Sequence, residues 1–406
     1  MDCLVNDMEY RLGDLYEVSN GLSKSGEFFG TGYPFLTFST VFNNYFIPNE
    51  IKDYVQSTAK EQKSYSIKAG DVFITRTSET TDELGMSCVA LKDYPTATYN
   101  GFCKRLRPIT ENTNPLYMGY YFRSEVFRAN FKKVASLITR ASLRNEDLMR
   151  FKVDLPSLET QTKISEMLYK YDSLIENNNK RIKVLEQMAE NLYKEWFVRF
   201  RFPGYETAEF ENGVPVGWKK GKIKEFITFL NGFAFSSDDY TDNGEYGIIT
   251  IKNVQDGVFA DGNVEHIAEI PSRMPDYCRL KIGDTLISLT GNVGRVCMVS
   301  GDNFLLNQRV AKIESKYPYY TYNFFRQESI YLSLCNIAYG TAQLNLSPIL
   351  ASNLKVIIPD EKVVKQYNDL VKPTYEFIQK IITENKNLTK QRDMLLPRLM
   401  SGKLEV

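Results

Sequence analysis

The strongest constraint on the fold is an internal repeat, because several sequence blocks occur twice, in the same order, along the 406 residues. From Tyr120 to the end of each half, the offset between matching residues is constant. Ordered blocks separated by unequal gaps are hard to obtain by chance, so the sequence predicts two homologous halves. The matching blocks are 12–21 with 223–232, 33–38 with 246–251, 69–91 with 282–300, 120–125 with 323–328, and 143–157 with 346–360.

Each half is predicted to be a mixed α/β lobe followed by a long helix. Short β-rich runs follow the Gly-Asp turns at 70–71 and 283–284, and Pro115 and Pro318 stand where helices are expected to begin. After each lobe, seam positions recur with the heptad period of a coiled coil. These positions are Ile164, Leu168, Tyr171, Ile175, Asn178, Ile182, Leu185, Ala189, Leu192 and Trp196, then Tyr367, Val371, Thr374, Ile378, Ile381, Asn385, Leu388, Arg392, Leu395 and Leu399.

The two helices are expected to pair with each other, because each carries a hydrophobic stripe that needs a partner. An antiparallel pair is favoured, since the break at residues 196–206 leads directly into the second half without a return path. Asn178 and Asn385 lie on the seam, where a buried asparagine fixes the register.

The expected fold class is α+β, with two pseudo-symmetric α/β lobes separated by two long α-helices packed as an antiparallel coiled coil. The expected boundaries are lobe one at 1–156, a central helix at 157–200, a linker at 201–217, lobe two at 218–359 and a C-terminal helix at 360–402.

Composition excludes several classes of protein. Lys+Arg and Asp+Glu both number 50, which argues against a strongly basic chromatin-type protein. No apolar run is long enough to cross a membrane, and the N-terminus does not resemble a signal peptide. The 6 cysteines form no CxxC pair, so we expect free thiols in a reducing cytoplasm. His266 is the single histidine, so no Cys/His metal site and no catalytic histidine are expected.

Two weak catalytic motifs have simpler explanations. The "NPLY" of residues 114–117 resembles the loop with which amino-methyltransferases grip a target base, but a helix N-terminus explains it better. The "PDEK" of 359–362 with Glu384 and Lys386 loosely resembles a nuclease metal site, but both residues fall within the heptad run. We therefore predict no nucleophile, metal or phosphate-binding loop in this chain.

Binding remains as the function, and two lobes held by a rod suit a bipartite DNA site. The segment 126–145 is basic without acids, which fits either a solvated helix face or a phosphate-contacting patch. The polar loops 75–81 and 289–295 can present side chains to base edges, although the same residues also favour plain turns. The candidate DNA-binding residues are Arg76, Thr77, Ser78, Lys104, Arg105, Lys132, Lys133, Arg140, Lys252, Asn253, Asn292, Arg295, Gln308, Arg309 and Gln343.

The sequence resembles the specificity subunits of type I restriction–modification systems. The likeness rests on "LPSLETQTKISEMLYKYDSLIE" and "LYKEWFVRF" in the centre, "GVPVGWK" opening lobe two, "GNVGRVCMVSGDNFLLNQRVAKI", "YGTAQLNLS" at 339–347, and "LLPRLMSGKL" near the end. Lobe one departs from the family pattern, with "NDMEYRLGDL" at its opening and "LITRASLR" in place of "GTAQLNLS".

The resemblance implies that the lobes are target recognition domains of a non-catalytic DNA-binding subunit. It also implies two methyltransferase subunits that bind S-adenosylmethionine, and up to two restriction and translocation subunits that use ATP and magnesium, so that this chain holds no cofactor itself. A DNA amino-methyltransferase and a coiled-coil scaffold without a DNA role are the alternatives. Saturable binding of S-adenosylmethionine would indicate the first, and salt-sensitive, sequence-selective duplex binding would exclude the second.

Overall fold

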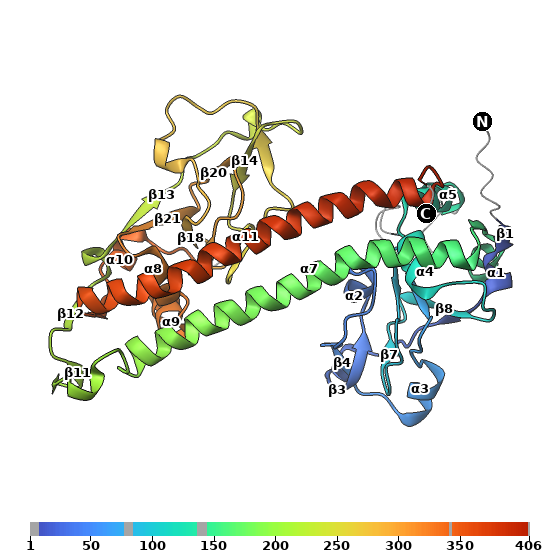
Figure 1. Ribbon diagram of the computed structural model, residues 1–406, viewed down its shortest axis with the longest axis horizontal. Coiled ribbons are helices and arrows are strands. Elements are labelled where there is room, and N and C mark those ends of the chain that lie inside the picture. Colours follow the sequence, from blue (N-terminus) through green and yellow to red (C-terminus); the bar gives the residue numbers. More distant parts are fainter. Residues whose placement is uncertain (1–7, 77–83, 136–143, 341–342, 405–406) are drawn as a thin grey trace. The chain divides into compact units, whose positions relative to one another are not determined.

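The computed structural model describes residues 8–76, 84–135, 144–340 and 343–404. The chain divides into two compact units, the first made of residues 1–175 with 388–406 and the second of residues 176–387. Each unit contains one lobe of short strands and helices together with part of both long helices (Figure 1). The α+β class and the two lobes are therefore confirmed.

Lobe one is built on a four-stranded antiparallel sheet. In spatial order its strands are β2 (Tyr16–Asn20), β8 (Cys103–Pro108), β5 (Val72–Thr75) and β6 (Ser87–Val89). A three-stranded sheet has the order β4 (Tyr54–Val55), β3 (Phe29–Leu36) and β7 (Thr98–Tyr99), and β1 (Met8–Arg11) pairs with β9 (Lys152–Leu155). The helices are α1 (Leu12–Leu15), α2 (Phe38–Asn43), α3 (Ala59–Ser64), α4 (Pro115–Tyr121), α5 (Glu125–Ala135) and α6 (Asn145–Arg150).

Lobe two repeats these three sheets in the same order and adds a two-stranded hairpin. Its four-stranded sheet has the order β13 (Ile227–Asn231), β21 (Val310–Ser315), β18 (Thr285–Ser288) and β19 (Val296–Met298). Its three-stranded sheet has the order β17 (Glu265–Ile267), β14 (Tyr246–Ile249) and β20 (Phe304–Leu306), and β12 (Lys219–Lys222) pairs with β22 (Lys355–Ile358). The remaining elements are the hairpin of β15 (Val254–Gln255) and β16 (Val258–Phe259), with α8 (Pro318–Phe325), α9 (Glu328–Ile337) and α10 (Pro348–Ser352).

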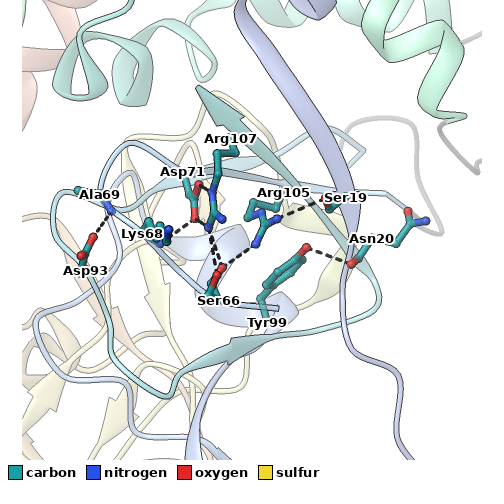
Figure 2. A network of polar contacts seen from close by, with 10 residues as sticks. All are labelled: Ser19, Asn20, Ser66, Lys68, Ala69, Asp71, Asp93, Tyr99, Arg105 and Arg107. Atoms are coloured by element: carbon teal, nitrogen blue, oxygen red, sulfur yellow. Dashed lines mark hydrogen bonds and ion pairs between the residues drawn. The ribbon is translucent and has the colours of Figure 1, made fainter. Parts of the chain in front are cut away.

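The Gly-Asp turns occupy the same structural position in both lobes. The Asp71 carboxylate accepts a hydrogen bond of 2.7 Å from the Lys68 backbone and forms an ion pair of 2.7 Å with Arg107 (Figure 2). In lobe two, Asp284 accepts 2.8 Å from the Lys281 backbone and pairs at 2.8 Å with Lys312. Each aspartate thus closes the turn before a central strand and neutralises a cation of the neighbouring strand, as the repeat predicts.

The predicted proline-led helices are confirmed. Pro115 and Pro318 occupy first-turn positions of α4 and α8, where the missing N–H costs no helical hydrogen bond. The Asn114 side chain caps α4 by accepting from the backbone N–H groups of Leu116 and Tyr117. The "NPLY" segment is therefore the start of a helix.

Two long helices carry the heptad pattern. The first, α7 (Leu158–Tyr193), spans 36 residues and continues into a π-helical turn at Lys194–Val198. The second, α11 (Glu361–Met400), spans 40 residues. In the second unit, Asn178 contacts Asn385 while Ala189, later in α7, accepts a hydrogen bond from Tyr367, earlier in α11. The helices therefore run antiparallel, as predicted.

The break after α7 has a physical cause. The π-helical turn buries both Trp196 and Phe197 in the core of the second unit, and Phe200 then adopts a left-handed backbone with φ of 57°. The segment predicted as a linker contains the hairpin of β10 (Phe210–Glu211) and β11 (Val214–Pro215). The Asn212–Gly213 pair joins these strands with positive φ at both residues, as a tight hairpin turn requires.

The cysteines described by the structure are free thiols, in agreement with the prediction for Cys88, Cys103, Cys278, Cys297 and Cys335. Burial raises the pKa of both Cys88 and Cys103 to about 12, so these thiols stay protonated. Within the described ranges, none of the helices combines the length and apolar character that crossing a bilayer demands.

Candidate nucleic-acid interface

A β-turn in lobe two presents two of the predicted DNA-binding side chains. The turn spans Asn307–Val310 and is closed by a hydrogen bond of 2.9 Å from the Val310 N–H to the Asn307 carbonyl. The Asn307 side chain also accepts from the backbone N–H of Arg309 at 3.3 Å. Gln308 and Arg309 occupy the two central positions, and both are exposed. An Asx turn of this kind holds the backbone in place and leaves these side chains facing outward.

The loop that follows β18 is attached to this turn. The Leu289 N–H donates to the Arg309 carbonyl at 3.0 Å, and the Leu289 carbonyl accepts from Leu346 at 2.7 Å. The Thr290 hydroxyl donates to the Asn345 side chain at 2.9 Å. Residues 289–295 therefore bridge the Asn307–Val310 turn and the segment 343–346.

Gly291 lies where three chain segments meet. Its backbone is left-handed, with φ of +73°, and a Cβ placed there would be 3.0 Å from Gln343 Nε2 and 3.4 Å from Ile251 Cδ1. The predicted residues Lys252, Asn292 and Gln343 thus come from segments that converge beside this glycine, and all three are exposed. Arg295, which ends the loop, is half-buried.

Asn253 is not available for DNA contact, and that prediction was wrong. Its side chain is 3% exposed. Its amide oxygen accepts from the Thr250 backbone at 2.9 Å, and its amide nitrogen donates to the Ala260 carbonyl at 2.7 Å. These bonds close the chain reversal after β14, so Asn253 positions its neighbour Lys252.

Lobe one contains the same turn at Asn100–Cys103. The Cys103 N–H donates to the Asn100 carbonyl at 2.9 Å, and the Asn100 side chain accepts from the Phe102 N–H at 2.8 Å. The Arg76 N–H donates to the Phe102 carbonyl at 2.9 Å, which matches the bond from Leu289 to Arg309 in lobe two. Arg76 is half-buried, and its Nε has no hydrogen-bond partner among the residues the structure describes.

Lys104 and Arg105 were wrongly predicted as DNA contacts, because both lie in the central strand β8 and each is 4% exposed. The Lys104 ammonium donates to Asn20 at 3.1 Å and also contacts Asn145. Burial, helped by the nearby Arg76 charge, lowers the Lys104 pKa.

Arg105 belongs to the internal polar network of lobe one (Figure 2). Its guanidinium donates to the Ser66 carbonyl at 2.7 Å and to the Ser19 hydroxyl at 3.3 Å. It also lies over the Tyr99 ring, 5.6 Å from the centroid. These bonds engage both terminal nitrogens of a cation that is almost removed from water, while its Nε has no hydrogen-bond partner among the described residues, so its role is structural.

The basic segment of lobe one is only partly described. Lys132 is exposed on α5, which buries Phe127 and Phe131, and Lys133 lies on the same helix. Thr77, Ser78 and Arg140 lie outside the described residues.

Residues 384 and 386 have structural partners. Glu384 accepts from Asn178 at 3.3 Å, and Lys386 donates to the Ser300 carbonyl at 2.7 Å. The described part of the chain contains no group of three or more side chains that could hold a metal ion.

Sequence reasoning missed Phe102, a ring that is 58% exposed at the turn position matching Arg309. The matching blocks of the internal repeat do not include residues 92–119. The shared asparagine of the two turns, Asn100 and Asn307, would have extended it across this gap.

Comparison with known proteins gives a consistent result. Residues 5–187 and 215–391 each match the family model described as the type I restriction modification DNA specificity domain. The specificity subunit of the MjaIX type I restriction enzyme from Methanocaldococcus jannaschii is 25% identical over 98% of this chain and 93% of its own length. The specificity subunit of the HindI type I restriction enzyme from Haemophilus influenzae is 23% identical over 98% of this chain and 99% of its own length.

A solved structure has the same fold. The crystal structure of the S subunit of a type I restriction–modification system from M. genitalium aligns with a TM-score of 0.56. The alignment covers 98% of this chain and 97% of that chain at 13% identity.

Proposed function

Because the chain belongs to the family of type I restriction–modification DNA specificity subunits, we propose that it reads a bipartite, asymmetric DNA site and directs methyltransferase and endonuclease subunits to it. In this role the chain is non-catalytic, and its two lobes are the target recognition domains. Each lobe reads one half-site, and the antiparallel helices set the gap between the half-sites.

One observation carries this proposal. The turns Asn100–Cys103 and Asn307–Val310 have the same hydrogen bonds in the two lobes, yet they present different exposed side chains. A shared backbone frame with different side chains suits two readers of the same kind that recognise different bases. The exposed Lys252, Asn292 and Gln343 extend the polar surface of lobe two around its turn.

The long helices support a role for partner subunits. Leu174, Val184 and Met188 of α7 are each at least 50% exposed, as are Leu370 and Met394 of α11. Apolar side chains on the outer faces of a helix pair suit burial against other proteins. The proposed partners are two methyltransferase subunits with S-adenosylmethionine and up to two restriction and translocation subunits with ATP and magnesium. No cofactor is assigned to this chain.

The test begins with methylation profiling of DNA from cells that carry the intact system, which identifies the modified site. Binding of the complex with its methyltransferase subunits is then measured on that duplex and on a duplex with both half-sites scrambled, across a range of salt. We expect tighter binding to the profiled site and affinity that falls as salt rises. Equal affinity for both duplexes would contradict the proposal, and saturable binding of S-adenosylmethionine by this chain alone would favour an enzyme.

A further inference from the structure

The third residue (i+2) of the turns Asn100–Cys103 and Asn307–Val310 differs between the lobes. This difference predicts which base each lobe recognises. Lobe one has Phe102 where lobe two has Arg309. Both residues donate their N–H to the turn asparagine, and both accept at their carbonyl from the residue that follows the central strand. The equivalence therefore rests on four hydrogen bonds and does not depend on an alignment of side chains.

The surroundings of Phe102 direct its ring outward. The preceding residue is Gly101, which has no side chain at the tip of the turn, and a Cβ there would lie 2.2 Å from the Ser23 hydroxyl and displace it. The aromatic rings buried in the same lobe, such as Phe73 and Tyr99, are 0% exposed, whereas Phe102 is 58% exposed. Its ring therefore contributes little to the core and is accessible to a bound molecule.

The chemistry of base edges suggests what this ring contacts. In the major groove, an arginine pairs with the two acceptors of guanine, and an apolar side chain contacts the 5-methyl group of thymine. We propose that the Phe102 ring contacts the 5-methyl group of a thymine in the half-site of lobe one, an inference that rests on the proposed function. Arg309 occupies the corresponding position in lobe two and reads a guanine. The same turn would thus read one base in each half-site, and its i+2 side chain would select the base.

Deoxyuridine provides a sharp test, because it keeps every hydrogen-bonding group of thymine and lacks only the methyl. Affinity is measured for the complex with its methyltransferase subunits, on duplexes in which each thymine of the lobe-one half-site, on either strand, is replaced singly. We expect one replacement to weaken binding about four-fold, the value for losing one buried methyl-sized group. In the Phe102→Ala variant, affinity for the parent duplex should fall, and replacing the sensitive thymine by deoxyuridine should no longer weaken binding.

Two control variants locate the effect. Phe29→Ala removes another exposed ring of lobe one, 41% exposed on β3, and should leave the deoxyuridine effect unchanged. Arg309→Ala should weaken binding while leaving that effect unchanged, because it acts on the other half-site. An unaltered unfolding midpoint of Phe102→Ala would show that the variant is folded.

The outcomes separate this inference from the proposed function. Failure of the complex to prefer its profiled site would overturn both. If the complex prefers that site but no thymine of the lobe-one half-site is sensitive to replacement, the proposed function stands and the role of Phe102 is overturned. The same holds if the deoxyuridine effect persists in Phe102→Ala. A ring wedged between base steps would instead raise the fluorescence of 2-aminopurine placed at one step and would also contradict the methyl contact.

Discussion

At the residue scale, Arg309 combines a fixed backbone with an exposed guanidinium. A bidentate contact to a base is worth roughly 1–3 kcal/mol. We therefore expect Arg309→Ala to lower affinity for the cognate site more than affinity for random duplex. Competition binding at constant salt measures the difference. Arg181→Ala, an exposed arginine on α7, is the matched control and should not change this specificity ratio. Equal losses on both duplexes would reassign Arg309 to a phosphate contact.

Arg105 should behave in the opposite way, because its guanidinium is buried and bonded to Ser66 and Ser19. Hydrogen bonds from charged groups contribute about 1.5–3 kcal/mol each, and truncation leaves the Ser66 carbonyl without this donor. Arg105→Ala is expected to lower the free energy of unfolding in urea. The salt dependence of DNA binding by the folded variant should stay the same. A shallower salt dependence with unchanged stability would show that Arg105 contacts phosphate.

At the scale of elements, the helix pair contains an asparagine layer between apolar positions of the seam. The Asn178 amide donates to the Asn385 side chain at 2.9 Å, and Asn385 donates to Asn179 at 2.9 Å. Ile182 and Ile381 follow and precede this layer on the seam. Shifting either helix by one heptad would separate the two asparagines and bury each against apolar side chains, so we predict that they fix the register.

A double-mutant cycle on Asn178 and Asn385 tests this role. Each single change to Ala removes the hydrogen bond between the two amides and leaves the other amide only its bond to Glu384 or Asn179, so the double variant should lose less stability than the sum of the two. We expect a coupling of at least about 0.5 kcal/mol in urea unfolding. Asn191, exposed on α7, provides the control, because Asn191→Ala combined with Asn385→Ala should be additive. Additivity for the seam pair itself would exclude a register role.

The length of the helices is predicted to set the gap between half-sites. One heptad inserted between residues 175 and 176 of α7 and another between 387 and 388 of α11 fall at the boundaries of the two units, so the contacts within each unit are kept. Seven residues add about 10 Å of helix. Methylation profiling should then show a gap about three base pairs longer, at about 3.4 Å per pair, with both half-sites unchanged. An unchanged gap in an active variant would show that the helices do not act as a spacer.

The helices and lobes could be predicted from the sequence, but the exposed side chains of the candidate interface could not all be predicted. Repeats and heptads are periodic, so both lobes, the proline-led helices and the antiparallel pair could be predicted. The amino-acid type of a single strand residue does not determine whether that residue is buried. Lys104 and Arg105 are as basic as Arg309, but β8 is a central strand while Arg309 lies on a turn. Phe102 was missed for the converse reason, because an aromatic residue in a β-rich stretch suggests a core.

At the scale of the whole molecule, each lobe has its own sheets and its own core, and each unit is compact by itself. Lobe one is also bonded to the helices of its unit. The Tyr120 hydroxyl contacts Asp172 of α7, and Asp172 pairs with Arg392 of α11. Asn114 also contacts Gln161 of α7, and Arg392 lies over the Tyr45 ring, so a foreign lobe that replaces lobe one should keep such contacts together with a tyrosine at the position of Tyr120. Residue 156 is a suitable junction, because β9 ends at Leu155 and pairs with β1.

The most direct test of the account is to exchange residues 1–156 for the first lobe of another family member that keeps this tyrosine and has a known site. Methylation profiling of cells carrying the chimaera with its partner subunits gives the new site. If each lobe reads one half-site independently and the helices set the gap, one half-site should become that of the donor. The other half-site and the gap should stay as they were. A chimaera that is active but changes both half-sites, or neither, would contradict the claim that each lobe reads one half of the site.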